Sequence, residues 1–350
     1  MLTPINSLTR AELTKQLSLL GCPKYKAEQV FRWLNRGVSD FEQMTDISKD
    51  LRKKLSERYY IEKIEILAKQ SSHEDGTVKY LFGLHDGNSI ETVLMKYHHG
   101  YSICISTQAG CKMGCIFCAS YERGATRNLT AGEILLQVIR ASLDSDIKIS
   151  NIVLMGTGEP LDNYDNVMDF LDMVGDEKGL NIGMRHISLS TCGLVPKIYE
   201  LAKLKKQLTL SISLHAPNNE LRSKLMPVNK AYNLESLIKA CHDYFEHTGR
   251  RISFEYAMIS GVNDTKECAF ELSALLKGFN CHVNLIPLNH VDGSPLKPST
   301  KQDMAAFIRI LENNHITTTV RRRLGSDIDA SCGQLRRRLN NGGKEWKHGQ

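Results

Sequence analysis

Three cysteines stand close together in the sequence Gly-Cys-Lys-Met-Gly-Cys-Ile-Phe-Cys at residues 110–118, in a C-x3-C-x2-C spacing. They directly follow a strand-like stretch, so we expect them on a loop at the end of a strand. Three thiolates on one loop can bind three irons of a cubane [4Fe–4S] cluster, which leaves the fourth iron open to an exogenous ligand. An open metal position indicates chemistry rather than structure alone. The alternatives are a zinc ion with a fourth ligand from elsewhere, or buried thiols.

Downstream of residue 118, short apolar strands alternate with amphipathic helices. The alternation predicts an α/β fold with a parallel sheet. About six units suit a partial (β/α)6 TIM-like barrel, with its chemistry on the loops after the strands, although a doubly wound sheet fits the same pattern. The predicted strands are 152–155, 186–190, 209–214, 252–258, 282–286 and 317–321, and the helices begin near residues 130, 163, 195, 219, 264 and 300.

Upstream of the cysteines, two other patterns precede the barrel. Residues 1–60 predict a small helical module, with a capping box from Thr9 to Glu12 and a second helix over 24–35. Residues 61–107 alternate in polarity, and Asp86-Gly87 is typical of a tight turn. We therefore expect an antiparallel hairpin extension, with strands near 78–84, 90–95 and 101–106.

Composition limits the class of protein. The 350 residues are 41% hydrophobic and 24% charged, which is typical of a globular protein and excludes a disordered or collagen-like chain. The chain shows no signal-peptide layout and no apolar run of the roughly 18–20 residues that a membrane span needs, so we expect a cytoplasmic protein. In a reducing compartment, ten cysteines are better interpreted as ligands, redox groups or small buried residues than as a disulfide framework.

The positive charge is concentrated at the C-terminus. The chain has 45 basic and 39 acidic residues, and residues 320–350 alone hold eight basic residues against three acidic ones. Such clustering favours a polyanion such as RNA, because neutralised phosphates release counterions. A solvated basic tail is the alternative.

The cysteine spacing with an aromatic residue at position 117 resembles the radical S-adenosylmethionine (SAM) superfamily, whose partial barrel matches the repeat count. Further motifs narrow the resemblance to the RlmN/Cfr family of RNA adenosine methyltransferases. The similar stretches are IETVLM at 90–95, CISTQAG at 104–110, MGTGEPL at 155–161, SLHAPN at 213–218 and DIDASCGQL at 327–335.

The resemblance implies a set of site residues. Cys111, Cys115 and Cys118 would bind the [4Fe–4S] cluster. Cys332 would carry the methyl group as S-methylcysteine, Cys104 would resolve the intermediate through a transient disulfide, and Glu91 would accept a proton. Two SAM molecules would be used per turnover. The SAM contacts would be Gly158, Glu159, Ser190, Ser213, Leu214, His215 and Asn289.

Without the resemblance, several of these residues have simpler interpretations. Cys104 alone would be a core thiol, and Glu91 alone would be an exposed strand carboxylate. His215 would be a core histidine with its hydrogen bonds satisfied.

The two glycines at 156 and 158 let the backbone approach a ligand closely, and Glu159 can accept hydrogen bonds from an ammonium group.

The resemblance also implies a domain plan, a substrate and partners. Residues 1–60 would be an RNA-binding accessory domain, 61–100 a hairpin linker, 101–325 the radical SAM barrel, and 326–350 the basic segment with the methyl carrier. Pro160 is typical of the RlmN branch, which implies C2 methylation of an adenosine in 23S rRNA and in tRNA, with the adenosine 3′ to the anticodon as the tRNA target. An electron donor such as flavodoxin and a monomeric state are also expected.

Other functions stay open at this point. Within the family, the alternative is methylation of C8 of the same rRNA adenosine, the Cfr type. Outside it, the chain could be a non-catalytic iron–sulfur or zinc RNA-binding protein, or a radical SAM enzyme that acts on a peptide or a small molecule.

Overall fold

The computed structural model describes residues 2–118, 125–289 and 295–328. Within these residues, seven strands run parallel and form a partial barrel. They are β6 (Gly100–Cys104), β9 (Ile149–Leu154), β10 (Ile187–Thr191), β11 (Thr209–Ser213), β12 (Ile252–Met258), β13 (Cys281–Pro287) and β14 (Thr317–Val320). They neighbour one another in chain order, with no reversal of the strand order. A doubly wound sheet requires such a reversal, so the structure confirms the partial barrel and excludes the alternative.

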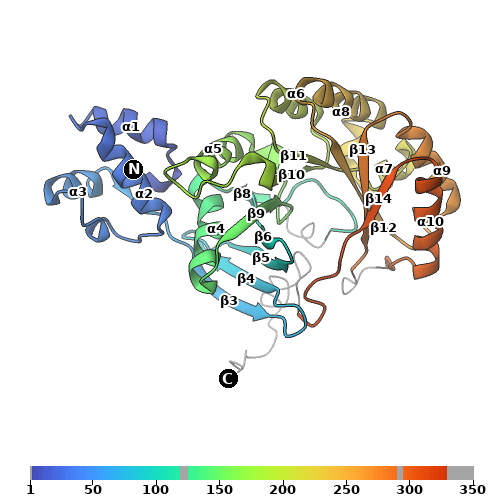
Figure 1. Cartoon of the computed structure of the whole chain (residues 1–350), viewed down its shortest axis with the longest axis horizontal. Helices are drawn as coiled ribbons and strands as arrows, with labels where there is room; N and C mark the ends of the chain where they lie inside the picture. Colours follow the sequence, from blue (N-terminus) through green and yellow to red (C-terminus); the bar gives the residue numbers. More distant parts are fainter. Residues whose placement is uncertain (1, 119–124, 290–294, 329–350) are drawn as a thin grey trace.

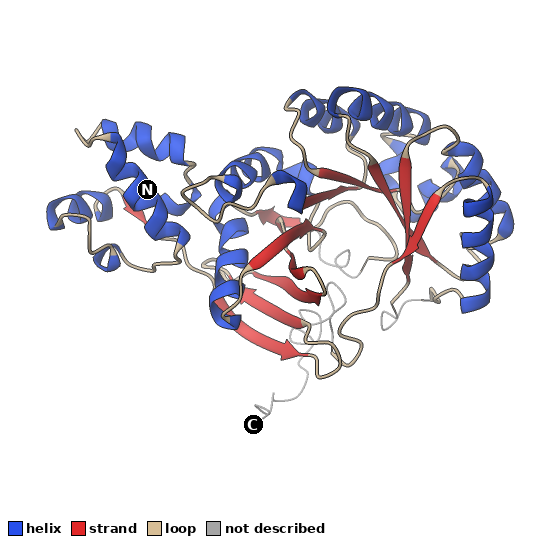
Figure 2. Ribbon diagram, viewed as in Figure 1, coloured by secondary structure: helices blue, strands red, loops and turns tan. Residues whose placement is uncertain are grey.

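Helices cover the convex side of the curved sheet (Figures 1 and 2). Within the described residues, seven α-helices lie between successive parallel strands: α4 (Ala131–Ser145), α5 (Tyr164–Gly175), α6 (Val195–Lys203), α7 (Asn219–Leu225), α8 (Leu234–Thr248), α9 (Lys266–Leu275) and α10 (Lys301–Asn313). Six of them begin within two residues of a predicted start. The sequence analysis missed α8, because it predicted one helix between β11 and β12, where the structure has both α7 and α8.

The hairpin extension continues the same sheet on one side of the barrel. Its strands are β3 (Glu65–Ser71), β4 (Val78–Gly83) and β5 (Ser89–Tyr97), and they pair antiparallel with one another and with β6. The prediction that the strand near 101–106 is antiparallel is therefore incomplete. Strand β6 pairs antiparallel with β5 and parallel with β9. It is the seam between the hairpin half and the barrel half.

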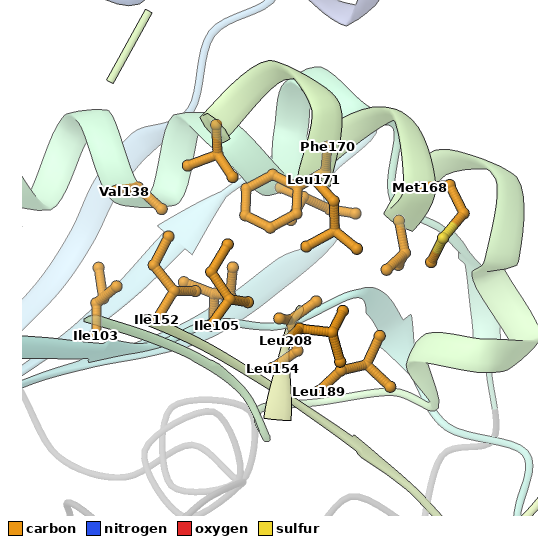
Figure 3. Packing of buried hydrophobic residues seen from close by; sticks show 14 of the residues in the cluster. Ile103, Ile105, Val138, Ile152, Leu154, Met168, Phe170, Leu171, Leu189 and Leu208 are labelled. Carbon is orange, nitrogen blue, oxygen red and sulfur yellow. The ribbon is translucent and has the colours of Figure 1, made fainter. Parts of the chain in front are cut away.

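Side-chain alternation gives the sheet two different faces. On β10, Leu189 is buried toward the helices, while Ser188 and Ser190 are half-buried on the concave face. Alternate residues of a strand point to opposite faces, so each strand places one set of side chains inside the barrel. On the convex face, Ile103, Ile152 and Leu189 pack under helices α4 and α5 (Figure 3).

The N-terminal module packs beside α4 at one end of the molecule (Figure 1). It contains α1 (Arg10–Ser18), α2 (Lys24–Asn35) and α3 (Lys49–Ser56), and its β1 (Thr3–Pro4) pairs with β2 (Tyr59–Tyr60). The capping box at Thr9 is present, and α2 has the predicted bounds. An ion pair of 2.7 Å between Arg10 and Asp176 joins the module to the residue after α5.

The C-terminal segment leaves β14 and crosses to the β3–β4 turn. The hydroxyl of Ser72 donates to Asp327 at 2.6 Å, and the backbone N–H of His73 donates to the same carboxylate at 2.8 Å. The N–H of Gly325 donates to Asp75 at 2.7 Å. The segment is thus tied to the hairpin up to Ile328, and Cys332 lies outside the described residues.

Candidate active site

The cysteine loop follows β7 (Gln108–Gly110), which pairs with β8 (Ala125–Asn128). Cys111, Cys115 and Cys118 are all partly buried. The loop rests on an apolar seat, where Met113, Cys115 and Phe117 pack against a cluster that includes Leu225, Met226 and Val228. The N–H of Ile116 also donates to the carbonyl of Leu225 at 3.1 Å. These contacts hold the three thiols at the carboxyl end of the barrel strands.

Burial raises the pKa of Cys111 to about 11 and the pKa of Cys115 to about 12. The neighbouring thiols of the loop add to both shifts, because negative charges on adjacent sulfurs repel one another. Without a cation, these thiols therefore stay protonated at neutral pH. A bound metal removes this penalty, since coordination deprotonates a thiol.

The turn at 156–160 packs against the chain itself. A Cβ atom added at Gly158, whose φ is +108°, would lie 2.6 Å from the Cβ of Gln108, and one at Gly156 would lie 2.6 Å from the carbonyl oxygen of Ile105. The sequence analysis explained these glycines by close approach to a ligand, which stays a prediction. In the structure, the chain's own neighbours Ile105 and Gln108 already leave no room for a side chain at either position.

The carboxylate of Glu159 is buried and bonded to the backbone. It accepts from the N–H of Cys192 at 2.8 Å and from the N–H of Leu161 at 3.0 Å. Burial raises its pKa, and the bond from Cys192 opposes this shift. Each of its two oxygens accepts from a different backbone N–H, so Glu159 ties the loop after β10 to the turn after β9. An ammonium group would have to share these oxygens.

Ser190 and Ser213 lie side by side on the concave face of β10 and β11, with hydroxyl oxygens 3.5 Å apart. Leu214 is fully buried, and its N–H donates to the carbonyl of Glu255 at 3.0 Å. Asn289 is exposed and follows β13. These residues, like Glu159, lie at or just beyond the carboxyl ends of their strands, as the sequence analysis expected.

His215 is buried and makes defined contacts. Its Nδ1 accepts from the N–H of Ala257 at 2.9 Å, so the neutral ring carries its proton on Nε2. Burial, and then the charge of Arg222, lowers its pKa to about 3. The ring also meets the Phe117 ring edge to face at 4.7 Å. His215 is therefore a buried histidine with Nδ1 bonded to the backbone, and it contacts the cysteine loop through Phe117.

Arg222 on α7 is fully buried, and its guanidinium binds three backbone carbonyls beneath the site. It donates to Cys192 at 2.7 Å, to Ser213 at 3.1 Å and to Leu214 at 3.2 Å. Cys192 and Leu214 follow β10 and β11, so one cation fixes two loops of the site. Sequence reasoning missed Arg222, because arginine is seldom fully buried.

Glu91 and Cys104 share the concave face of the hairpin half. Cys104 lies opposite Val93 on β5, which makes it a diagonal neighbour of Glu91, at a spacing of about 7–8 Å. Glu91 is 4% exposed and forms a 3.0 Å ion pair with Lys79, which is 0% exposed. The interpretation of Glu91 as an exposed carboxylate is thus wrong. The pairing with Lys79 was not predicted, since alternation alone does not show which strand positions meet.

Two contacts link this pair to the rest of the site. The hydroxyl of Ser106 donates to the carbonyl of Glu91 at 2.7 Å and accepts from the N–H of Thr157 at 3.0 Å. On the other side, Leu324 of the C-terminal segment packs against the cluster formed by Val93, Met95 and Cys104. The segment that leads to Cys332 therefore packs, at Leu324, against the cluster to which Cys104 belongs.

A cavity of about 340 Å³ lies inside the barrel, toward the amino ends of the strands. Ser188, Ser211 and Glu255 line it. Ser188 and Ser211 each lie two residues before Ser190 and Ser213 on the same face of their strands, and Glu255 lies opposite Ser213 on β12. None of the predicted SAM contacts lines this cavity. The strict alternation of serine with leucine or isoleucine along β10 and β11 is the sequence signal for this polar interior.

The curved parallel half-barrel, with three thiols on the loop after its first strand, defines a radical SAM enzyme. Residues 105–271 match the model of the Radical SAM superfamily, and residues 4–61 match the ribosomal RNA large subunit methyltransferase N-terminal domain. A crystal structure of a radical SAM methyltransferase from Sphaerobacter thermophilus superposes with a TM-score of 0.90 at 43% identity and covers 95% of this chain and 98% of that chain.

Sequence relatives identify the family. A probable dual-specificity RNA methyltransferase RlmN from Alkaliphilus oremlandii is 54% identical over 95% of this chain and 97% of the relative. One from Clostridium novyi is 53% identical over 90% and 92% of the two chains. The chain belongs to the RlmN family of RNA methyltransferases.

The family brings a [4Fe–4S] cluster and SAM as cofactors. The donor set fits the cluster, because three thiols share one loop and are only partly buried. Among the helices of the described residues, none is long and apolar enough to cross a membrane.

Proposed function

We propose that this enzyme methylates C2 of an adenosine in 23S rRNA and of the adenosine 3′ to the anticodon in tRNA. The observation that carries the proposal is the arrangement on the concave face of the hairpin half. Glu91 and Cys104 are diagonal neighbours there, and the C-terminal segment packs at Leu324 against the cluster that contains Cys104. The names of the RlmN relatives support RNA as the substrate.

When bound, the cluster and SAM supply the one-electron chemistry that the electron-poor C2 carbon of adenine requires. Cys111, Cys115 and Cys118 would hold the cluster, on a loop whose Phe117 packs against the apolar cluster that contains Leu225. Gly158, Glu159, Ser190, Ser213, Leu214, His215 and Asn289 are our candidates for the surroundings of SAM. Their strand ends support this assignment, because barrels of this kind place function at that edge.

The chain's own residues would handle the methyl group and the proton. The thiol of Cys332 would lose its proton to solvent and, as a thiolate, take a methyl group from one SAM molecule by displacement, with S-adenosylhomocysteine as the leaving group. After the carbon joins adenine, Glu91 would accept the proton that leaves C2. Cys104, as a thiolate, would then attack the sulfur of Cys332. This forms the disulfide, breaks the bond between that sulfur and the transferred carbon, and leaves that carbon to take up a proton as the methyl group of the released base.

The position of Leu324 makes the meeting of Cys104 and Cys332 physically reasonable. Cys332 is eight positions after Leu324, which packs against the cluster that contains Cys104. Asp327 is held at the β3–β4 turn, so the five positions from Asp327 to Cys332 allow a reach of about 17 Å.

The test is nucleoside mass spectrometry after anaerobically reconstituted enzyme, SAM and a reductant act on unmodified rRNA fragment and on tRNA. We expect 2-methyladenosine from the wild type and from Cys281→Ala, a control on β13, and none from Cys332→Ala or Glu91→Gln. Production of 8-methyladenosine would refute the C2 assignment. Normal turnover by Cys332→Ala would refute the methyl-carrier role.

The partners and the setting complete the proposal. We propose that a small electron-transfer protein such as flavodoxin reduces the cluster, that the enzyme acts as a monomer and that it works in the cytoplasm. Residues 1–60 would contact RNA as an accessory domain, 61–100 would link it to the barrel at 101–325, and 326–350 would carry Cys332. Sedimentation of the free enzyme and of its RNA complex tests the monomer.

A further inference from the structure

Three potential metal ligands converge at the junction of the helical module, the hairpin and the barrel. Glu62 follows β2, His85 lies in the β4–β5 turn, and Glu133 is in the first turn of α4. The Nδ1 atom of His85 is 3.4 Å from Oε1 of Glu62 and 3.8 Å from Oε1 of Glu133. Within the described part of the chain, this is the one such trio whose ligand atoms all lie within 4.8 Å of one another.

One of these ligand atoms is buried without a hydrogen-bond donor. The side chain of Glu62 is 1% exposed, and its Oε2 accepts from the hydroxyl of Thr130 at 2.8 Å. Its Oε1, which faces His85 and Glu133, accepts no hydrogen bond. A buried carboxylate oxygen without a donor is costly, so this atom indicates a missing partner.

The charges around the trio do not balance. Glu62, Glu133 and Asp86 bring three carboxylates, and Arg127 brings one guanidinium, which binds both oxygens of Glu133 at 2.6 and 2.7 Å and also pairs with Asp86. With a neutral His85, two negative charges remain uncompensated.

We propose that Glu62, His85 and Glu133 bind a divalent zinc ion that fastens the helical module to the barrel. Zinc bonds of about 2.0–2.1 Å in tetrahedral geometry place ligand atoms roughly 3.3–3.4 Å apart, close to the two separations from His85. An imidazole ligand favours zinc over magnesium or calcium. Water would take the fourth position.

Neighbouring residues already orient the ligands. Thr130 holds Glu62 and Arg127 holds Glu133, in the way that supporting partners fix metal ligands. The backbone of Glu62 is bonded twice to Asn6, which donates from Nδ2 at 3.1 Å and accepts at Oδ1 at 3.0 Å. A metal at Glu62 therefore bears directly on the first residues of the helical module.

The test measures bound metal on cluster-loaded enzyme under anaerobic conditions, so that the cysteine loop is occupied. Zn²⁺ and Co²⁺ are titrated into wild type, His85→Ala, Glu62→Gln and the control His98→Ala, which removes an exposed histidine at the β5–β6 turn. We expect wild type and control to bind one equivalent more than the other two variants. In those variants the affinity at this site falls at least about tenfold, the smallest loss seen when a supporting partner of a ligand is removed.

Two further readouts identify the site. The Co²⁺ spectrum should show oxygen and nitrogen ligation without a thiolate charge-transfer band. Zinc should raise the melting temperature of wild type by a few degrees, and that of Glu62→Gln not at all. Equal metal content in all four proteins, thiolate ligation of the extra ion, or no extra ion in wild type would each overturn the proposal. None of these readouts depends on RNA methylation.

Discussion

Replacing Lys79 with methionine should destabilise the enzyme strongly, because it leaves the carboxylate of Glu91 buried without its cation. The two side chains are 0% and 4% exposed, and their charged atoms are 3.0 Å apart. Removing one partner of such a pair costs about 3–5 kcal/mol. For a chain of this size, that corresponds to a fall of about 4–7 °C in melting temperature.

A double-mutant cycle isolates the pair. Lys79→Met, Glu91→Gln and the double variant are compared by thermal and urea unfolding at pH 5 and pH 8. The double variant should recover at least half of the loss of Lys79→Met, since the unpaired charge is gone. The control Lys96→Met replaces an exposed lysine of β5 and should change the free energy of unfolding by less than about 0.5 kcal/mol.

A loss below about 1 kcal/mol at pH 8, or a double variant no more stable than Lys79→Met, would refute the reasoning that burial makes this pair interdependent.

Gly158→Ala should lower the melting temperature and the SAM affinity more than Gly261→Ala does. Both glycines have positive φ, but of the two only Gly158 has a neighbour within 4 Å of an added Cβ. Equal losses in differential scanning fluorimetry and SAM titration would contradict the close contact with Gln108. The free energy of unfolding should fall as the pH drops from about 6.5 toward 3, by up to about 1.4 kcal/mol per pH unit from His215 alone. The reason is that the unfolded chain takes up a proton that the buried ring of His215 does not accept. His215→Asn keeps a hydrogen-bond acceptor and tolerates the left-handed backbone. In urea titrations across that pH range, this variant should lose the contribution of His215 to the pH dependence of the free energy of unfolding. An unchanged pH dependence would assign that contribution to other groups. Arg222→Met should cost at least about 3 kcal/mol and reduce the iron bound per chain, whereas the exposed control Arg309→Met should change neither; normal iron content in Arg222→Met would show that the loops hold without it.

Local signals in the sequence were sufficient for the helical module and the barrel repeat. The capping box at Thr9 and the helix over 24–35 depend on neighbours three or four residues apart, and both are as predicted. The pairing of β6 was only half predicted. Its partner β5 is adjacent in the chain, whereas its partner β9 follows after a helix of 15 residues, and no local pattern specifies that contact.

The candidate site shows the same division. The spacing of Cys111, Cys115 and Cys118 predicts their common loop, because the residues lie within eight positions. The partners of the other site residues come from distant segments. Lys79 meets Glu91 across a strand pair, and Arg222 reaches the ends of two strands. Composition predicts lysine and arginine at the surface, so only the folded chain shows them buried.

The tie between Asp327 and the β3–β4 turn sets an order of assembly. It joins Ser72 and Asp327, which are 255 positions apart, so Ser72 is synthesised long before Asp327. Synthesis proceeds from the N-terminus, and domains fold as they emerge, so the hairpin and the barrel can be complete before the final segment leaves the ribosome. A chain that stops short of this segment would keep its cofactor-binding half and lack the cysteine at position 332. If Cys332 carries the methyl group as proposed, truncated products of translation would be folded but unable to begin a methylation cycle.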